Sequence, residues 1–252
     1  MFLEQISWVQ AKEYFEQKDI VIIPVGSTEN HGSQLALGTD FLIPRALCER
    51  MDDRLEILIA PTIPFGVADQ HALFPGTITI GSRGLYDLVT RVADQLYGHG
   101  IRKFVFLNGH GGNTPVLQDV CLDLDKKHAL GCLLNWWTLA GDINPKWKGG
   151  HGGGEETAAM LAINPSFVHM EYFMPFVPKD LSEDLTFAGA FHVFSNGISV
   201  PVPRRVDHYS SCGWYGPDSP ETATAEWGEE MLNATADFCV DFIRKFEKVR
   251  ID

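Results

Sequence analysis

Three glycine-rich stretches place histidine and carboxylate side chains next to apolar runs. The first is GSTENHGSQLALGTD, residues 26–40, which directly follows the run IVIIPV. The second is NGHGGN, residues 108–113, after FVFL, and the third is GGHGGGEET, residues 149–157. Their candidate site residues are Glu29, His31, Asp40, His110, His151, Glu155 and Glu156. Imidazole and carboxylate groups without cysteine form a mixed nitrogen and oxygen ligand set, which suits divalent zinc, manganese or iron.

Each of these residues, taken alone, also fits a structural role. Asp40 precedes the helical run FLIPRALCER and fits a helix N-cap, and Glu155 and Glu156 fit acids that complement a helix N-terminus. His110 and His151 each fit a polar loop histidine. A phosphate cradle fits the glycines poorly, because neither loop continues into the Lys-Ser/Thr of a P-loop. The metal interpretation is favoured because three separate loops each supply a histidine.

An alternation of strands and helices is expected to position these stretches. Short apolar runs predict strands at 19–25, 57–61, 77–80, 103–108 and 130–137. Helical patterns occur near the N-terminus, at about 41–53, 84–98, 115–128 and 220–247, and in the run TAAMLAI after residue 156. This alternation predicts an α/β fold, a three-layer α/β/α sandwich with a mostly parallel central sheet. The Gly-, Pro- and aromatic-rich segments 141–154 and 172–220 predict long active-site or interface loops.

The composition limits the classes of partner and compartment. A length of 252 residues with 45% hydrophobic residues predicts a single domain over residues 1–252. Twenty Lys and Arg against 33 Asp and Glu give a net charge of -13, which disfavours nucleic acid and anionic membranes as partners. The five cysteines form no C-x-x-C pair, so a reduced, cytoplasmic protein is expected. Glu4 interrupts the N-terminal apolar residues, so neither a signal peptide nor membrane insertion is predicted.

The order of the motifs resembles the creatininase, or creatinine amidohydrolase, family. GSTENHGSQLALGTD is followed by FPGTITI at 74–80, then NGHGGN and HGGGEET, so the resemblance covers about residues 20–165. It implies a three-layer α/β fold, two divalent metal ions per subunit, hydrolysis of non-peptide amide C–N bonds in small molecules, and a homo-hexamer. It also implies that Glu29 and His110 bind one metal, that His31 binds the other, and that Asp40 bridges both.

The sequence departs from the family at the second metal site. Creatinine-hydrolysing members have Tyr and Glu directly after the histidine of the NGH motif, and that Glu completes the second site. This chain has Gly111 and Gly112 there. We therefore expect Glu156 to be the replacement ligand, with Glu155 as the alternative, and Gly111 to lie beside the substrate.

Two tryptophans resemble pocket residues of the family. Trp137 ends the apolar run LLNWW, and Trp147 precedes His151 by four residues. Both occupy places where creatinine-hydrolysing members have pocket tryptophans, so the resemblance implies that both bind substrate. Without the resemblance, a tryptophan in such an apolar run is more typical of a core.

The expected chemistry is hydrolysis by metal-activated water. Two cations sharing a water lower its pKa from 15.7 toward about 7, which provides a bridging hydroxide as the nucleophile. We expect His151 to donate the proton to the leaving nitrogen, since an imidazole titrates near neutral pH. The expected substrate is a small cyclic amide or an N-formyl or N-acyl heterocycle.

Three alternatives remain open at the level of sequence. The chain could be a creatinine amidohydrolase proper, a two-metal phosphohydrolase, or a metal-binding protein without catalysis. A phosphohydrolase needs cations to hold phosphate, and Arg45, Arg83 and Lys148 form no cluster in the sequence. The apolar segment HMEYFMPFVP at 169–178 predicts a buried contact between subunits, and therefore a homo-oligomer.

Overall fold

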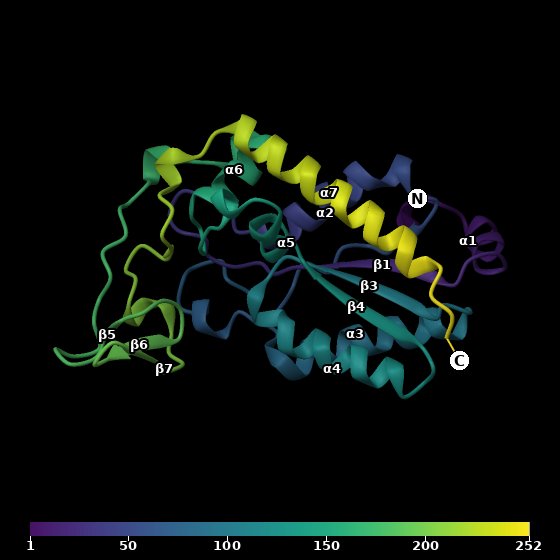
Figure 1. Cartoon of the computed structure of the whole chain (residues 1–252), viewed down its shortest axis with the longest axis horizontal. Helices are drawn as coiled ribbons and strands as arrows, with labels where there is room; N and C mark the ends of the chain where they lie inside the picture. The colour runs from purple at the N-terminus through teal and green to yellow at the C-terminus, as the bar shows by residue number, and fades with distance from the viewer. Residues whose placement is uncertain (252) are drawn as a thin grey trace.

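A four-stranded parallel sheet forms the centre of the molecule (Figure 1). The computed structural model describes residues 1–251. Strands β1 (Ile20–Val25), β2 (Leu58–Ile59), β3 (Lys103–Asn108) and β4 (Leu130–Asn135) pair in the order β2-β1-β3-β4. Each pair is parallel, and Val25 at the end of β1 is in register with Asn108 at the end of β3.

Helices cover both faces of this sheet, because successive strand residues point to opposite sides. Ile20 and Ile22 of β1 belong to the core cluster beneath α2 (Thr39–Met51), α5 (Trp136–Ile143), α6 (Gly154–Ile163) and α7 (Ala225–Glu247). Val21 and Ile23 belong to the opposite cluster, with α3 (Gly81–Gly98) and α4 (Thr114–Asp125). The predicted three-layer α/β sandwich is thereby confirmed.

The remaining elements are short. Helix α1 (Trp8–Phe15) follows the N-terminus and begins with a capping box between Ser7 and Gln10. Single-turn 3-10 helices occur at Leu3–Gln5, Asp52–Arg54, Asp69–His71, Gly111–Asn113, Pro145–Trp147, Pro165–Phe167, Met170–Tyr172, Val206–His208 and Pro220–Thr222. Within residues 1–251, no helix combines the length and the apolar character needed to cross a membrane.

Two of the predicted strands differ in the structure. Residues 77–80 form only isolated bridges, Ile78 with Thr28 and Thr79 with Gly66, so this segment is not a strand of the sheet. The strand predicted at 130–137 ends at Asn135, and Trp136 is the first residue of α5. Apolar residues alone could not distinguish a strand end from the start of a buried helix.

The segment predicted as a loop at 172–220 contains a second, smaller sheet. Strands β5 (Thr186–Phe187), β6 (His192–Ser195) and β7 (Ile198–Pro201) form an antiparallel sheet in that order. Figure 1 shows it at one end of the molecule, away from the C-terminus. Its strands have only two to four residues each, which is too short for a clear alternation of polar and apolar residues.

The order of the strands creates a crevice between β1 and β3. The connection from β1 leads to β2 on one side, and β3 and β4 lie on the other side, so the direction of winding changes between β1 and β3. Ligands of open α/β sheets bind beyond the strand ends at such a point. Gly109 permits close contact with α2 there, since a Cβ at this position would lie 1.8 Å from the Asp40 carbonyl oxygen.

Candidate metal centre

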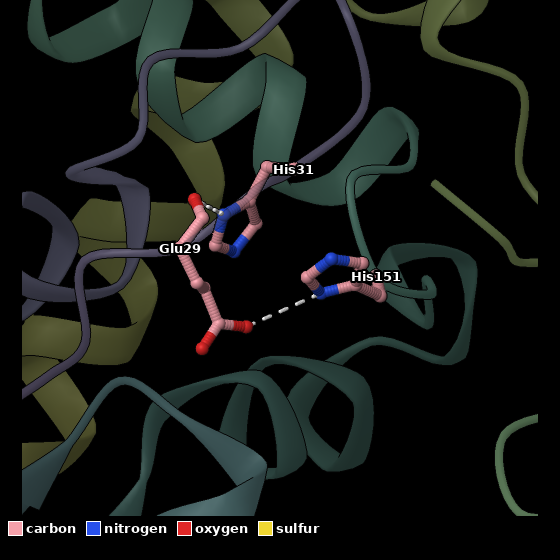
Figure 2. A group of neighbouring side chains, drawn as sticks. All are labelled: Glu29, His31 and His151. Atoms are coloured by element: carbon pink, nitrogen blue, oxygen red, sulfur yellow. Dashed lines mark hydrogen bonds and ion pairs between the residues drawn. The ribbon is translucent and has the colours of Figure 1, made fainter. Parts of the chain in front are cut away.

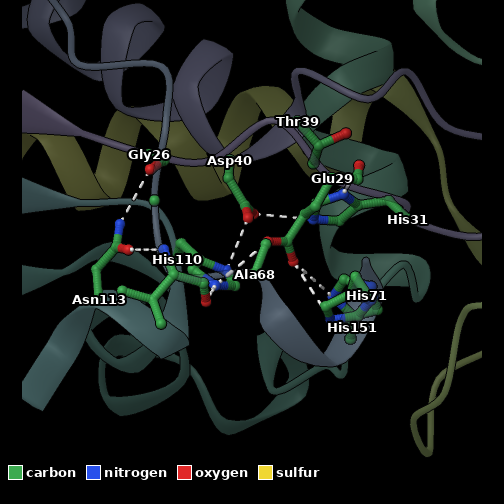
Figure 3. A network of polar contacts seen from close by, with 12 residues as sticks. Gly26, Glu29, His31, Thr39, Asp40, Ala68, His71, His110, Asn113 and His151 are labelled. Atoms are coloured by element: carbon green, nitrogen blue, oxygen red, sulfur yellow. Dashed lines mark hydrogen bonds and ion pairs between the residues drawn. The ribbon is translucent and has the colours of Figure 1, made fainter. Parts of the chain in front are cut away.

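Asp40 lies between two histidines at the crevice (Figure 3). Its Oδ1 is 2.8 Å from His31 Nε2 and its Oδ2 is 2.9 Å from His110 Nδ1. Although burial alone would raise the pKa of Asp40, the two imidazoles outweigh it and hold that pKa well below its usual range. The helix N-cap of α2 is Gly38, so the interpretation of Asp40 as an N-cap is wrong.

Each of these two histidines directs one ring nitrogen to a backbone carbonyl and the other to Asp40. His31 Nδ1 lies 3.1 Å from the Glu29 carbonyl oxygen, and His110 Nε2 lies 2.8 Å from the Val67 carbonyl oxygen. A carbonyl oxygen only accepts, so these nitrogens carry hydrogens. His31 Nε2 and His110 Nδ1 then offer lone pairs to a cation when the rings are neutral, as metal-binding histidines do.

Glu29 lies beside them with its carboxylate completely buried. Its Oε2 is 3.2 Å from His110 Nε2, and its Oε1 is 3.4 Å from His71 Nε2 and 3.9 Å from His151 Nδ1. Neither oxygen has a hydrogen-bond partner. Burial raises the pKa of Glu29 to about 8, despite the opposing effect of His110.

Glu156, and not Glu155, faces the histidines from the first turn of α6. Glu156 Oε2 lies 3.7 Å from His31 Nε2 and accepts a hydrogen bond of 2.6 Å from the Gly152 amide. Burial raises the pKa of Glu156 to about 7 and that of Glu155 to about 9. Glu155 belongs to none of the ligand groups within residues 1–251, and its backbone amide donates to Asp218.

Among residues 1–251, three groups of side chains are close enough to hold a metal ion. Glu29, Asp40 and His110 form one, and His31, Asp40 and Glu156 form another, so Asp40 belongs to both. The third is Glu29, His31 and His151, drawn in Figure 2. The structure thus brings together all five metal ligands that the sequence predicted.

The chemistry of the residues fits divalent cations. The free energy of burying Glu29, Asp40 and Glu156 together is high unless positive charge compensates them, and a divalent ion would supply it. Neither Glu29 oxygen has a hydrogen-bond partner among the described residues. Each of the three ligand groups combines imidazole nitrogen with carboxylate oxygen. Such a donor set suits zinc or manganese.

His151 reaches the centre from the glycine-rich loop before α6. Its Nε2 lies 2.7 Å from the Asn30 carbonyl oxygen, so Nε2 carries a hydrogen and Nδ1 faces Glu29. Tyr215 stacks on the ring at a centroid distance of 5.1 Å. Burial, followed by the charges of His71 and His31, lowers the pKa of His151 well below its usual value. The ring is therefore neutral, and Nδ1 can accept a proton.

A cavity of about 380 Å³ opens beside these groups. Trp137, Gly111 and Phe191 are among its lining residues, together with Asp40 and His151. Trp147 is not among them: it is 6% exposed and belongs to the same core cluster as Trp136. The predicted pocket position of Trp147 therefore differs from the structure, because the turn Pro145–Trp147 directs this side chain into the apolar core. A larger groove of about 990 Å³ between α1 and α3 contains none of the ligand groups.

Gly112 explains why the second group takes its carboxylate from α6. A Cβ at Gly112 would lie 2.2 Å from the Val67 carbonyl oxygen and 2.5 Å from His110 Nε2. Any side chain at this position would have to displace the backbone or His110. The position that carries Glu in creatinine-hydrolysing members is thus closed here, whereas Gly111 has no atom nearer than 4.0 Å to such a Cβ.

The sequence did not predict three residues at the centre. His71, in the turn Asp69–His71, is fully buried and lies against Glu29 and His151. Asn30 contacts both His71 and His151, and Tyr215 arrives from the segment after the small sheet. The one available signal was the position of His71, three residues before the FPGT motif.

The burial of His71 affects its charge. Burial, followed by the positive charges of His110 and His31, lowers the pKa of His71 to about 3. In contrast, although burial would lower the pKa of His31 and of His110, the neighbouring carboxylates raise them to about 10 and about 9. His71 is therefore neutral beside a cluster of charged groups.

Comparison with known proteins identifies the family. A family model described as "Creatininase: Creatinine amidohydrolase" matches residues 4–243, which extends the resemblance seen in the motifs to nearly the whole chain. Creatinine amidohydrolase of Pseudomonas putida is 26% identical over 269 residues, covering 97% of this chain and 96% of the relative. Mycofactocin precursor peptide peptidase of Mycobacterium tuberculosis is 32% identical over 238 residues, covering 87% and 82%.

Solved structures share the fold. One described as "Creatininase Mn" superposes with a TM-score of 0.80 at 24% identity, covering 98% of this chain and 99% of the other. A mutant creatininase of Zn-Zn type gives a TM-score of 0.77 at 24% identity, with 98% of each chain covered. These similarities confirm the predicted fold.

We predict that Asp40→Asn costs more bound metal than any other single ligand change. Asp40 belongs to both ligand groups, and an amide supplies neither the charge nor the second good donor of a carboxylate. Metal per protomer, measured after dialysis, tests this. Glu155→Gln is the matched control and should keep its metal, since Glu155 lies outside the groups. An Asp40→Asn protein that retains two equivalents would contradict the bridging role.

Proposed function

The chain belongs to the creatininase family, and we propose that it is a metal-dependent hydrolase of an amide C–N bond in a small molecule. We further propose that it holds two divalent ions, zinc or manganese, with iron as the third candidate from the donor types. Glu29, Asp40 and His110 would hold one ion, and His31, Asp40 and Glu156 the other. When bound, the ions would supply a Lewis acid and a water acidic enough to ionise near neutral pH.

One observation carries the proposal: two ligand groups share the single carboxylate of Asp40 beside an open cavity. A structural site is closed by its protein ligands, whereas a catalytic site keeps a position open. Each group here offers only three protein side chains, and Asp40 and Glu156 also line the cavity. The arrangement therefore favours catalysis over a purely structural metal.

His151 is proposed as the residue that moves the proton. Its Nε2 donates to the Asn30 carbonyl, so Nδ1 is the nitrogen free to accept a proton and pass it to the leaving nitrogen. The neutral ring has the lone pair that the first of these steps needs. The rings of Tyr215, His71 and His31 pack around it, with centroid distances of 5.1, 4.3 and 4.4 Å.

The cavity walls favour a small, flat and uncharged substrate. Trp137 and Phe191 provide aromatic surface, and Gly111 leaves space beside His110. In the part of the chain that the structure describes, no lysine or arginine lines this cavity. We therefore propose a small cyclic amide or an N-formyl or N-acyl heterocycle, with Trp137 and Gly111 as substrate contacts.

The competing functions find less support. For a phosphohydrolase, none of the candidate cations Arg45, Arg83 and Lys148 lines the cavity in the described part of the chain, and both arginines form ion pairs with neighbouring carboxylates. Creatinine amidohydrolase proper remains a candidate because of the Pseudomonas putida relative, although Gly112 excludes the Glu of that site. A short peptide is a second candidate substrate, since a relative at 32% identity is described as a peptide peptidase.

We also propose a cytoplasmic homo-oligomer, a hexamer by family resemblance, of one amidohydrolase domain over residues 1–252, the last of which lies outside the described residues. The segment predicted to form a contact supports this, because Tyr172 and Val177 are 63% and 68% exposed. The molar mass from light scattering tests it, and a particle of 28.0 kDa would contradict it.

We predict that His151→Ala keeps its metal but loses about 10²–10⁴-fold in kcat, the range typical for removal of a general acid or base. The alternative is that His151 is a ligand, since it forms a group with Glu29 and His31. Metal content and kcat measured on the same preparation separate the two roles. A parallel loss of metal and activity would make His151 a ligand.

The order of substrates is also predictable. We expect kcat/KM to be highest for a formylamino-pyrimidine or a hydantoin-like ring, low for creatinine, and lowest for a dipeptide, because the aromatic walls fit a flat ring. The metal-loaded enzyme assayed against all four substrates tests this order. If creatinine is best, Glu156 compensates fully for Gly112; if the dipeptide is best, the peptidase assignment replaces ours.

A further inference from the structure

His71 is the one buried histidine at the centre to which the proposed mechanism gives no role. It is fully buried, yet its Nε2 has no hydrogen-bond partner. Figure 3 shows its ring beside that of His151, with both directed at the carboxylate of Glu29. Of the two rings, that of His71 is nearer to this carboxylate: His71 Nε2 lies 3.4 Å from Glu29 Oε1. A buried polar atom left without a partner is unfavourable, so this placement requires an explanation.

Asn30 determines which nitrogen of His71 carries the hydrogen. The Asn30 side-chain oxygen accepts the Gly32 amide at 3.1 Å, and its nitrogen donates to the Gly213 carbonyl at 3.1 Å. This fixes the orientation of the amide. The same nitrogen lies 3.5 Å from His71 Nδ1, so Nδ1 is the acceptor and Nε2 bears the hydrogen of the neutral ring.

Glu29 has one oxygen for this hydrogen and another for a cation. Its Oε2 is nearer to His110, which with Asp40 completes the first ligand group. Its Oε1 is the oxygen near His71. A hydrogen bond to Oε1 would restrict rotation of the carboxylate and keep Oε2 directed toward His110 and Asp40.

We propose that His71 is a positioning residue that holds Glu29 for metal binding, by donating a hydrogen bond from Nε2 to Glu29 Oε1. This inference rests on the proposed function, since it assigns Glu29 to a metal. His71 is among the residues that line the cavity, but only 1% of its side chain is exposed and its Nε2 faces Glu29. It acts through Glu29, and its ring also packs on His151 at 4.3 Å.

Three substitutions distinguish a hydrogen-bond donor at position 71 from a side chain that only fills space. In His71→Gln the side-chain amide nitrogen can take the place of Nε2 and donate to Glu29. In His71→Asn the shorter side chain places its amide near Nδ1, too far from Glu29. His71→Phe keeps a flat ring but has no donor. A structural role predicts that Phe is the best replacement, whereas the proposed hydrogen bond predicts that Gln is.

The experiment is a measurement of Zn²⁺ affinity by chelator competition, with thermal unfolding to verify folding. We expect His71→Phe and His71→Asn to weaken binding about 10–100-fold, as loss of an outer hydrogen bond to a metal ligand typically does. His71→Gln should stay within about threefold of the unmodified chain. His99→Gln is the control, because His99 is exposed and stacks on Phe15 outside the centre.

The steady-state kinetics provide a second readout. Since the proposed role of His71 is to hold Glu29 and not the substrate, kcat should fall in His71→Asn while KM changes little. Equal Zn²⁺ affinities for the Gln and Phe variants, or unchanged affinity in His71→Phe, would overturn the role of His71 but leave the proposed function unaffected. An unmodified chain that binds Zn²⁺ no better than Asp40→Asn would overturn the proposed function, and the inference with it.

Discussion

The burial of Glu29 is the constraint on which the centre depends. Its carboxylate is completely removed from water, and in residues 1–251 its ion-pair neighbours are three histidines, His71, His110 and His151. Within the described residues no lysine or arginine forms an ion pair with it, although a buried carboxylate normally requires such a partner. The raised pKa of Glu29 has the same cause, a buried negative charge without enough positive charge near it. A cation at this position would remove it, which is why the geometry favours a metal centre over a network of hydrogen bonds.

The fold creates this burial through the strand order. Because β1 and β3 are neighbours in register, the loops that follow them begin at the same edge of the sheet. Gly109 then lets the start of α2 approach closely, so that Asp40 reaches both loops. Glycine is needed because the approach is between backbones, where even one methyl group would collide.

The same packing also explains the departure from the creatinine-hydrolysing pattern. At Gly112 the Val67 carbonyl and His110 occupy the space that a side chain would need. The second ligand group therefore takes its carboxylate from Glu156 on α6, which comes from the other layer of helices. Compared with the creatinine-hydrolysing pattern, the types of ligand stay the same, but one carboxylate comes from α6 and not from the loop after β3. Family membership thus fixes the class of reaction more firmly than the substrate.

The sequence by itself determined the types and the approximate places of the candidate ligands. Histidine and carboxylate next to strand-like runs indicated Glu29, His31, Asp40 and His110, because parallel strands end at a common edge. The alternation of strands and helices was likewise sufficient for the three-layer fold.

Only the tertiary structure decided contacts between segments far apart in the chain. Glu155 and Glu156 are equivalent in sequence, and the helical rotation of about 100° between them directs only Glu156 at His31. Trp137 and Trp147 look alike as pocket residues, yet one lines the cavity and the other fills the core. Apart from its position before the FPGT motif, His71 carried no local signal, since its role depends on Asn30 and Glu29, about 40 residues earlier. Local patterns encode which face of an element is apolar, whereas such pairings depend on how complete layers pack.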